Sequence, residues 1–135
     1  TLDRSSAASD VYKRQGEDYP RDTFRHEQDP LVTENGKTAL FAGCAHCGIV
    51  NILKSAEDVL GRAPDAVFAG FHLYNPSLGK SEPDELVDAV GEKLRGDKVA
   101  HYFTGHCTGK EAYERLKRKL GDRLGEMPAG SDFTV

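Results

Sequence analysis

Long apolar runs and an excess of basic charge are both missing from this 135-residue sequence. No apolar segment approaches the roughly 20 residues that a membrane-spanning helix needs, and no charged-then-apolar leader resembles a signal peptide. The formal net charge is −4, and the basic cluster from Lys117 to Lys119 falls where it complements the C-terminal end of a predicted helix. We therefore expect a cytoplasmic protein that binds neither membranes nor nucleic acid.

Cysteine is also scarce. The chain has 3 cysteines, an odd number, and two of them, Cys44 and Cys47, flank His46. A secreted domain stapled by disulfides is not expected from this pattern, and the thiols are expected to be reduced.

Residues 1–15 have neither helical nor strand periodicity. The part from Ser5 to Gln15 resembles the translation of a sequencing adaptor. We therefore expect residues 1–15 to be a non-native or disordered segment, and residues 16–135 to form one soluble domain whose natural chain extends upstream. The alternative is a disordered polar tail.

Three short apolar segments each end just before a histidine. The predicted strands are 39–42, 66–69 and about 98–103, and the histidines that follow them are His46, His72 and His106. In an α/β protein the turns after parallel strands lie at one edge of the sheet, where such folds place their chemistry. Neutral imidazoles are good ligands for zinc and similar metals, so the repeated context predicts a metal site. His101, inside a strand pattern, is not expected to take part.

The remaining elements follow from periodicity and turn chemistry. Asn35-Gly36 predicts a hairpin leading into the first of these strands, and residues 48–60 have helical spacing. Ser81 is expected to cap a second helix that ends at Gly96, and Thr108 with Glu111 forms a capping-box pattern before a third. We expect the tail, residues 131–135, to form an edge strand.

At these motifs the chain resembles a known family. The segments are Gly43–Ile52 (GCAHCGIVNI), Ala69–Leu73 (AGFHL) and Gly105–Gly109 (GHCTG). They are similar to the C-terminal half of metallo-β-lactamase-fold hydrolases, in the branch that includes dihydropterin-ribofuranosylaminobenzene 5′-phosphate synthase-like proteins. Phe24–Gln28 resembles the segment that precedes the motif strand in that branch. The resemblance implies an α/β fold: half of an αββα sandwich, with a mixed sheet and three helices.

The same resemblance implies roles for the histidines. His46 matches the histidine that completes a first metal site, and His106 matches the one that completes a second. His72 falls near the usual position of a bridging aspartate, as a ligand or a substrate contact, and His26 is a further candidate substrate contact. The implied cofactors are two divalent metal ions, with zinc foremost and manganese or iron as alternatives. They would generate hydroxide from a shared water.

One departure from the family pattern is large. The His-x-His-x-Asp-His motif, which supplies most metal ligands in the family, is missing from the sequence, together with the N-terminal half of the sandwich. We therefore expect a parent that is a metal-dependent hydrolase or synthase and a chain that is inactive alone. Its expected partners are a small-molecule substrate, phosphorylated or pterin-like, and either the missing half-domain or a second copy against the uncovered sheet face.

Two other interpretations stay open from the residues alone. In one, Cys44, Cys47, His106 and Cys107 form a closed, four-ligand structural zinc site in a binding module. In the other, Cys44 or Cys47 is a redox or nucleophilic thiol assisted by His46.

Overall fold

The structure, a computed structural model, describes residues 23–135. The predicted non-native segment, residues 1–15, lies outside the described residues. Helices and strands alternate along most of the chain: β1 (Leu31–Glu34), β2 (Lys37–Ala42), α2 (Ile49–Leu60), β3 (Ala66–Ala69), β4 (Tyr74–Asn75), β5 (Lys80–Ser81), α3 (Asp84–Gly96), β6 (His101–Thr104), η1 (His106–Thr108), α4 (Lys110–Leu120), η2 (Gly121–Arg123) and β7 (Leu124–Glu126). None of the helices in this range is long and apolar enough to cross a membrane.

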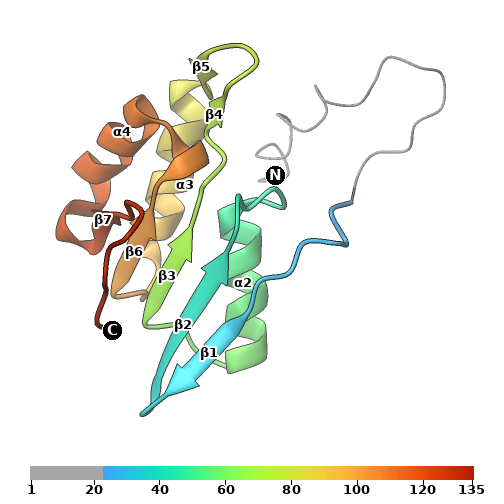
Figure 1. The fold of residues 1–135 in the computed structure, drawn as a ribbon, viewed down its shortest axis with the longest axis vertical. Coiled ribbons are helices and arrows are strands. Elements are labelled where there is room, and N and C mark those ends of the chain that lie inside the picture. Colours follow the sequence, from blue (N-terminus) through green and yellow to red (C-terminus); the bar gives the residue numbers. More distant parts are fainter. Residues whose placement is uncertain (1–22) are drawn as a thin grey trace.

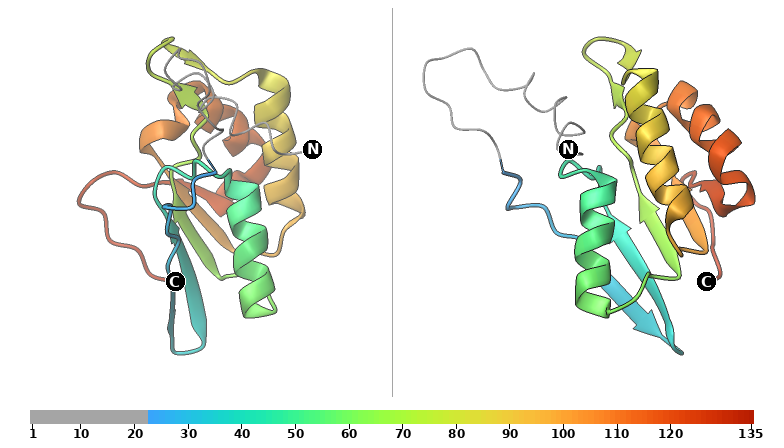
Figure 2. Two further views of the ribbon diagram at one scale, coloured as in Figure 1. Left: turned by 90° about the vertical axis from the view of Figure 1, so that its right-hand side faces the viewer. Right: turned by 180° about the vertical axis from the view of Figure 1, so that it is seen from behind.

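A five-stranded sheet with the order β1-β2-β3-β6-β7 organises the chain. The β1-β2 hairpin is antiparallel and turns at Asn35-Gly36, as predicted, whereas β2, β3, β6 and β7 are parallel. Each parallel strand lies beside the one that precedes it in the chain, always on the same side. Each connection between consecutive parallel strands contains one α-helix. Because such crossovers are right-handed, all three helices must lie on the same face, as Figures 1 and 2 show.

The core lies between that face and the helices. Alternate strand positions point to opposite sides of a sheet, and Leu40, Val67, Tyr102 and Leu124 all point to the helical side, where each is at most 1% exposed. Leu53, Val90 and Leu116, one from each helix, are buried against them. The amphipathic spacing of the sequence therefore produces a single two-layer core.

The opposite face of the sheet has an aromatic ladder. Phe41, Phe68 and Phe103 are register partners on adjacent strands and stack with centroid distances of 5.0 and 4.9 Å. Phe133, from the C-terminal tail, covers one end of the ladder, 4.4 Å from Phe103. Phe41 remains 40% exposed and Val32 53% exposed. No helix covers this face in residues 23–135, so the structure has one layer of helices on one sheet, as expected for half of a sandwich.

Three local predictions were wrong, because contacts with residues elsewhere in the chain, rather than the local sequence pattern, determine the structure there. Ser81 does not cap α3: it pairs with Tyr74 as part of β5, and the N-cap residue is Pro83. Thr108 forms no capping box, because its hydroxyl oxygen accepts a hydrogen bond from the Phe71 backbone at 2.9 Å. Residues 131–135 form no strand; the last strand is β7, Leu124–Glu126, which pairs with β6.

Candidate metal centre

The C-terminal ends of β2, β3 and β6 meet at one edge of the sheet, and backbone hydrogen bonds hold the three following turns together. The Gly70 amide donates to the Gly43 carbonyl at 2.7 Å, and the Leu73 amide donates to the Cys107 carbonyl at 3.1 Å. The turns after all three predicted strands are therefore in contact. This edge carries His46, His72 and His106, the three histidines predicted to follow the strands.

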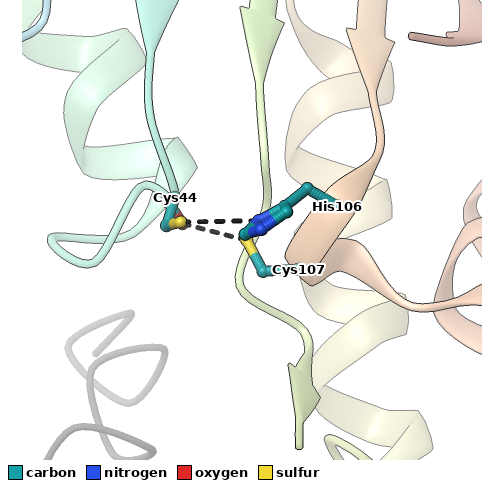
Figure 3. A group of neighbouring side chains, drawn as sticks. All are labelled: Cys44, His106 and Cys107. Carbon is teal, nitrogen blue, oxygen red and sulfur yellow. Dashed lines mark hydrogen bonds between the residues drawn. The ribbon is translucent and has the colours of Figure 1, made fainter. Parts of the chain in front are cut away.

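Two cysteines and one histidine converge at this edge (Figure 3). One ligand atom from each of Cys44, His106 and Cys107 lies within 4.8 Å of the other two, and no other set of three His, Cys, Asp or Glu ligand atoms in residues 23–135 is as close together. Cys44 Sγ is 3.7 Å from His106 Nδ1, and Cys107 Sγ donates to the Cys44 carbonyl at 3.6 Å. Burial raises the pKa of the Cys107 thiol to about 12, and the neighbouring Cys44 adds to the effect. Without a cation, Cys107 is thus a neutral thiol.

His46 and His72 form a second group nearby. Their rings are 4.3 Å apart between centroids, tilted by 58°. His72 is only 8% exposed, has a left-handed backbone with φ of 49°, and its Nδ1 is buried with no hydrogen-bond partner among residues 23–135. Burial lowers the pKa of His72, and the positive charge of His46 lowers it further. A buried, neutral imidazole with a free lone pair is prepared to bind a cation.

Glu27 holds the His46 turn in place. Its two carboxylate oxygens accept the backbone amides of His46 at 2.8 Å and Cys47 at 2.9 Å. Burial alone would raise the pKa of Glu27, but these hydrogen bonds outweigh it and hold the pKa below its usual value. In the sequence, Glu27 stands out only as part of the resembling segment Phe24–Gln28, and this role was not predicted. Glu27 lies 19 positions before His46, with the β1-β2 hairpin between them, so no local pattern indicated this contact.

The other predicted residues lie apart from the cysteine cluster. Cys47 Sγ faces the Phe24 carbonyl at 3.9 Å, so the structure assembles three of the four ligands of the structural zinc interpretation. His26 is exposed, with its ring 6.0 Å from Phe24, which in turn stacks on His46 at 5.5 Å. His101 is exposed on β6 and stacks on Phe103 instead.

Comparison with solved structures decides the fold. A crystal structure of a metal-dependent hydrolase of the β-lactamase superfamily matches with a TM-score of 0.66 and 25% identity, over 78% of this chain and 39% of that one. The chain has part of the metallo-β-lactamase fold. Among curated proteins, the 7,8-dihydropterin-6-methyl-4-(β-D-ribofuranosyl)-aminobenzene-5′-phosphate synthase of Methanocaldococcus jannaschii is 30% identical over 101 residues. That match covers 74% of this chain and 32% of the synthase. No family model matches.

These matches confirm the resemblance seen in the three motifs and the expected fold class, an α/β unit with a mixed sheet and three helices. The chain spans about a third of the length of the curated relative and about two fifths of the solved structure. It therefore corresponds to part of each of these longer proteins.

The residues at this edge fit metal ions of the kind that the metallo-β-lactamase fold implies. The orphaned Nδ1 of His72 is the structural observation that supports the fit, since a buried polar atom without a partner is costly unless a ligand satisfies it. His46, His72 and His106 do not by themselves form a three-ligand group within the described residues. Each of them can contribute to a centre whose remaining ligands come from elsewhere in a parent protein.

Proposed function

We propose that the chain is part of a metal-dependent hydrolase or synthase of the metallo-β-lactamase superfamily. The observation that carries the proposal is the contact of His46 with the buried His72, whose Nδ1 has no hydrogen-bond partner within residues 23–135, at the sheet edge that metallo-β-lactamase folds use. In a core that served only for packing, this nitrogen would find a partner or be replaced by carbon.

In the parent, His46, His72 and His106 would hold two divalent ions, with zinc foremost and manganese or iron as alternatives. Bound there, such ions lower the pKa of a shared water and polarise the bond under attack. The chain's own contribution is positional: Glu27 fixes the backbone of His46, and burial keeps His72 neutral so that its lone pair is available. His26, on the exposed side of Phe24, is a candidate substrate contact, as is His72 where it is not a ligand.

The chain alone should be catalytically silent. Catalytic zinc usually has three protein ligands and an open position, and one or two histidines for each ion should bind weakly. The remaining ligands would come from the missing half-domain, seated on the sheet face that carries Phe41 and Val32. In its absence, a second copy of the chain would cover that apolar surface.

The substrate is proposed to be a phosphorylated or pterin-like small molecule, because the curated relative is named as a synthase of such a compound. A cavity of about 370 Å³ beside His106, lined also by Tyr113 and Met127, would admit a ligand of that class. The parent is proposed to be cytoplasmic, a compartment that keeps thiols such as those of the three free cysteines reduced.

A chimera tests the proposal. The matching segment of the Methanocaldococcus synthase is replaced by residues 23–135 of this chain, so that the relative supplies the rest of the fold. We expect metal-dependent turnover that falls at least roughly a hundredfold in His46→Ala and His72→Leu chimeras, while a His101→Ala chimera keeps it. The isolated chain is assayed in parallel on phosphodiesters, lactones and β-lactams with added metal. Turnover by the isolated chain, or equal activity in all chimeras, would contradict the proposal.

A further inference from the structure

The histidine-based function leaves two cysteines unexplained. Cys44 and Cys107 come from different strand ends, 63 positions apart. Cys44 directs its sulfur atom toward His106, and Cys107 directs its sulfur atom toward the Cys44 carbonyl (Figure 3). We propose that Cys44, His106 and Cys107 form a binding site for one thiophilic divalent cation, typified by Zn²⁺, held by two thiolates and one imidazole nitrogen. The site shares His106 with the centre proposed above, but its other protein ligands are the two cysteines, so all three of its ligands come from this chain.

The spacing of the ligand atoms suits a tetrahedral cation. With Zn–S of about 2.3 Å and Zn–N of about 2.0–2.1 Å, a tetrahedral site has a sulfur-to-nitrogen edge of about 3.6 Å and a sulfur-to-sulfur edge of about 3.8 Å. Cys44 Sγ and His106 Nδ1 are already 3.7 Å apart. The three ligand atoms lie within 4.8 Å of one another, so any remaining adjustment is about 1 Å. Rotation of a thiol about its side-chain bond is enough to supply it.

The backbone around the site is fixed before any cation binds. Gly70 lies between the two cysteine turns: a Cβ there would be 2.6 Å from Cys107 Sγ and 3.5 Å from Cys44 Cα. Only a residue without a side chain leaves room for Cys107 to approach Cys44. His106 has a left-handed backbone with φ of 51°, a conformation that is uncommon for residues other than glycine, although histidine adopts it more often than most. The ligands are thus arranged at some conformational cost, which a cation would offset.

The donor set also selects the cation. Two thiolates neutralise a divalent charge and favour zinc or another soft metal over magnesium, calcium or manganese, which prefer oxygen. Three protein ligands leave a fourth position open, and His106 is exposed, so a cation can enter from solvent. A neutral imidazole has one lone pair, so a cation on Nδ1 leaves Nε2 protonated. His106 can then serve this cation or the histidine centre, but not both at once.

Cobalt is the probe that tests the site, because Co²⁺ replaces Zn²⁺ in such sites and absorbs through sulfur-to-cobalt charge transfer. The full 135-residue chain, reduced and free of oxygen, is titrated with Co²⁺ and then with Zn²⁺ as competitor. We expect one cobalt per chain, tetrahedral visible bands and a charge-transfer band that zinc abolishes. Cys44→Ser and Cys107→Ser should each lower that band by about half or more, and His106→Ala should remove the tetrahedral bands.

Cys47→Ser is the matched control, since Cys47 lies outside the cluster and should leave the spectrum unchanged. An unaltered band in Cys44→Ser, or its loss in Cys47→Ser, would overturn the assignment. The wild-type spectrum decides even where a variant does not fold, because cobalt bound without charge transfer, or no binding at all, excludes the thiolates. His46→Ala separates the two proposals: the cobalt site predicts no change in that variant, whereas the chimera assay above predicts loss of turnover.

Discussion

Gly70→Ala is a sharp test of how the strand-end turns are packed, because it adds one methyl group where the structure has no room. The added Cβ would be 2.6 Å from Cys107 Sγ and 3.2 Å from the Gly43 carbonyl oxygen. Non-bonded carbon and sulfur atoms normally stay at least about 3.5 Å apart, so the thiol must move by about 1 Å. The φ angle of Gly70 is not in the left-handed region, so the cost is steric rather than conformational.

Overpacking of this kind typically costs about 1–3 kcal/mol in a core. The lower half of that range applies here, because a rotatable thiol is the closest neighbour and the carbonyl contact at 3.2 Å needs only a small shift. We therefore expect the free energy of unfolding to fall by about 1–2 kcal/mol, which for a domain of this size lowers Tm by roughly 4–8 °C. The displaced Cys107 should also weaken the sulfur-to-cobalt band.

Urea denaturation and cobalt titration of the same samples measure both effects. Gly43→Ala is the matched control in the adjacent turn, since a Cβ there meets nothing within 4 Å and its φ is not in the left-handed region. It should change stability by less than about 0.5 kcal/mol and leave the cobalt spectrum intact. If Gly70→Ala matched the wild type in both measurements, Cys107 could not lie where the structure places it, and the three-ligand site would be refuted.

Three further substitutions test the supporting contacts by chemical denaturation. Glu27→Ala removes the acceptor of two backbone amides and should lower the free energy of unfolding by about 1–3 kcal/mol. An unchanged free energy of unfolding would show that the His46 turn does not need Glu27 for its stability. Tyr102→Phe loses a buried hydrogen bond to the Leu94 carbonyl, which keeps two other donors, so the loss should stay at about 0.5–1 kcal/mol. The Thr38 amide lowers the pKa of Asp65 below 3.8, so the carboxylate stabilises the fold above that pH. The wild type should have a higher free energy of unfolding than Asp65→Asn at neutral pH, and this difference should shrink as the pH falls from about 5 through the lowered pKa. A difference in unfolding free energy that does not change with pH would exclude this linkage.

Much of the architecture follows from the sequence because its strands are short, apolar and followed by glycine. Residues 66–69 form β3 as predicted, since all four are buried between neighbouring strands. The third strand begins later than predicted, at His101, because the Ala100 and His101 amides both donate to the Asp65 carbonyl instead of continuing the ladder. Such strand boundaries depend on hydrogen-bond partners that are distant in the sequence, so they cannot be predicted from hydrophobic periodicity.

The candidate site was also predictable only in part. The motifs predicted that His46, His72 and His106 follow three parallel strands, and the structure places all three at one sheet edge. Which side chains meet there could not be derived from spacing. Cys47 faces the Phe24 carbonyl because of its place in the turn before α2, whereas Cys107 reaches Cys44 because Gly70 leaves space between them. Short-range sequence patterns predict where a strand and a turn lie. The direction of each side chain in the turn depends on tertiary packing, which these patterns do not specify.

The measurement that tests the central claim most directly is the zinc affinity of the chain, determined by competition with a chromogenic chelator, for the wild type, His106→Ala and His101→Ala. His106 is the residue that both proposed metal sites share, and His101 is an exposed histidine on the same strand-and-turn segment with no place in either. If a metal site lies at the strand ends, we expect His106→Ala to bind zinc at least roughly a hundredfold more weakly than the wild type. His101→Ala should bind zinc with the affinity of the wild type. Equal affinity in all three proteins would contradict a metal site at the strand ends.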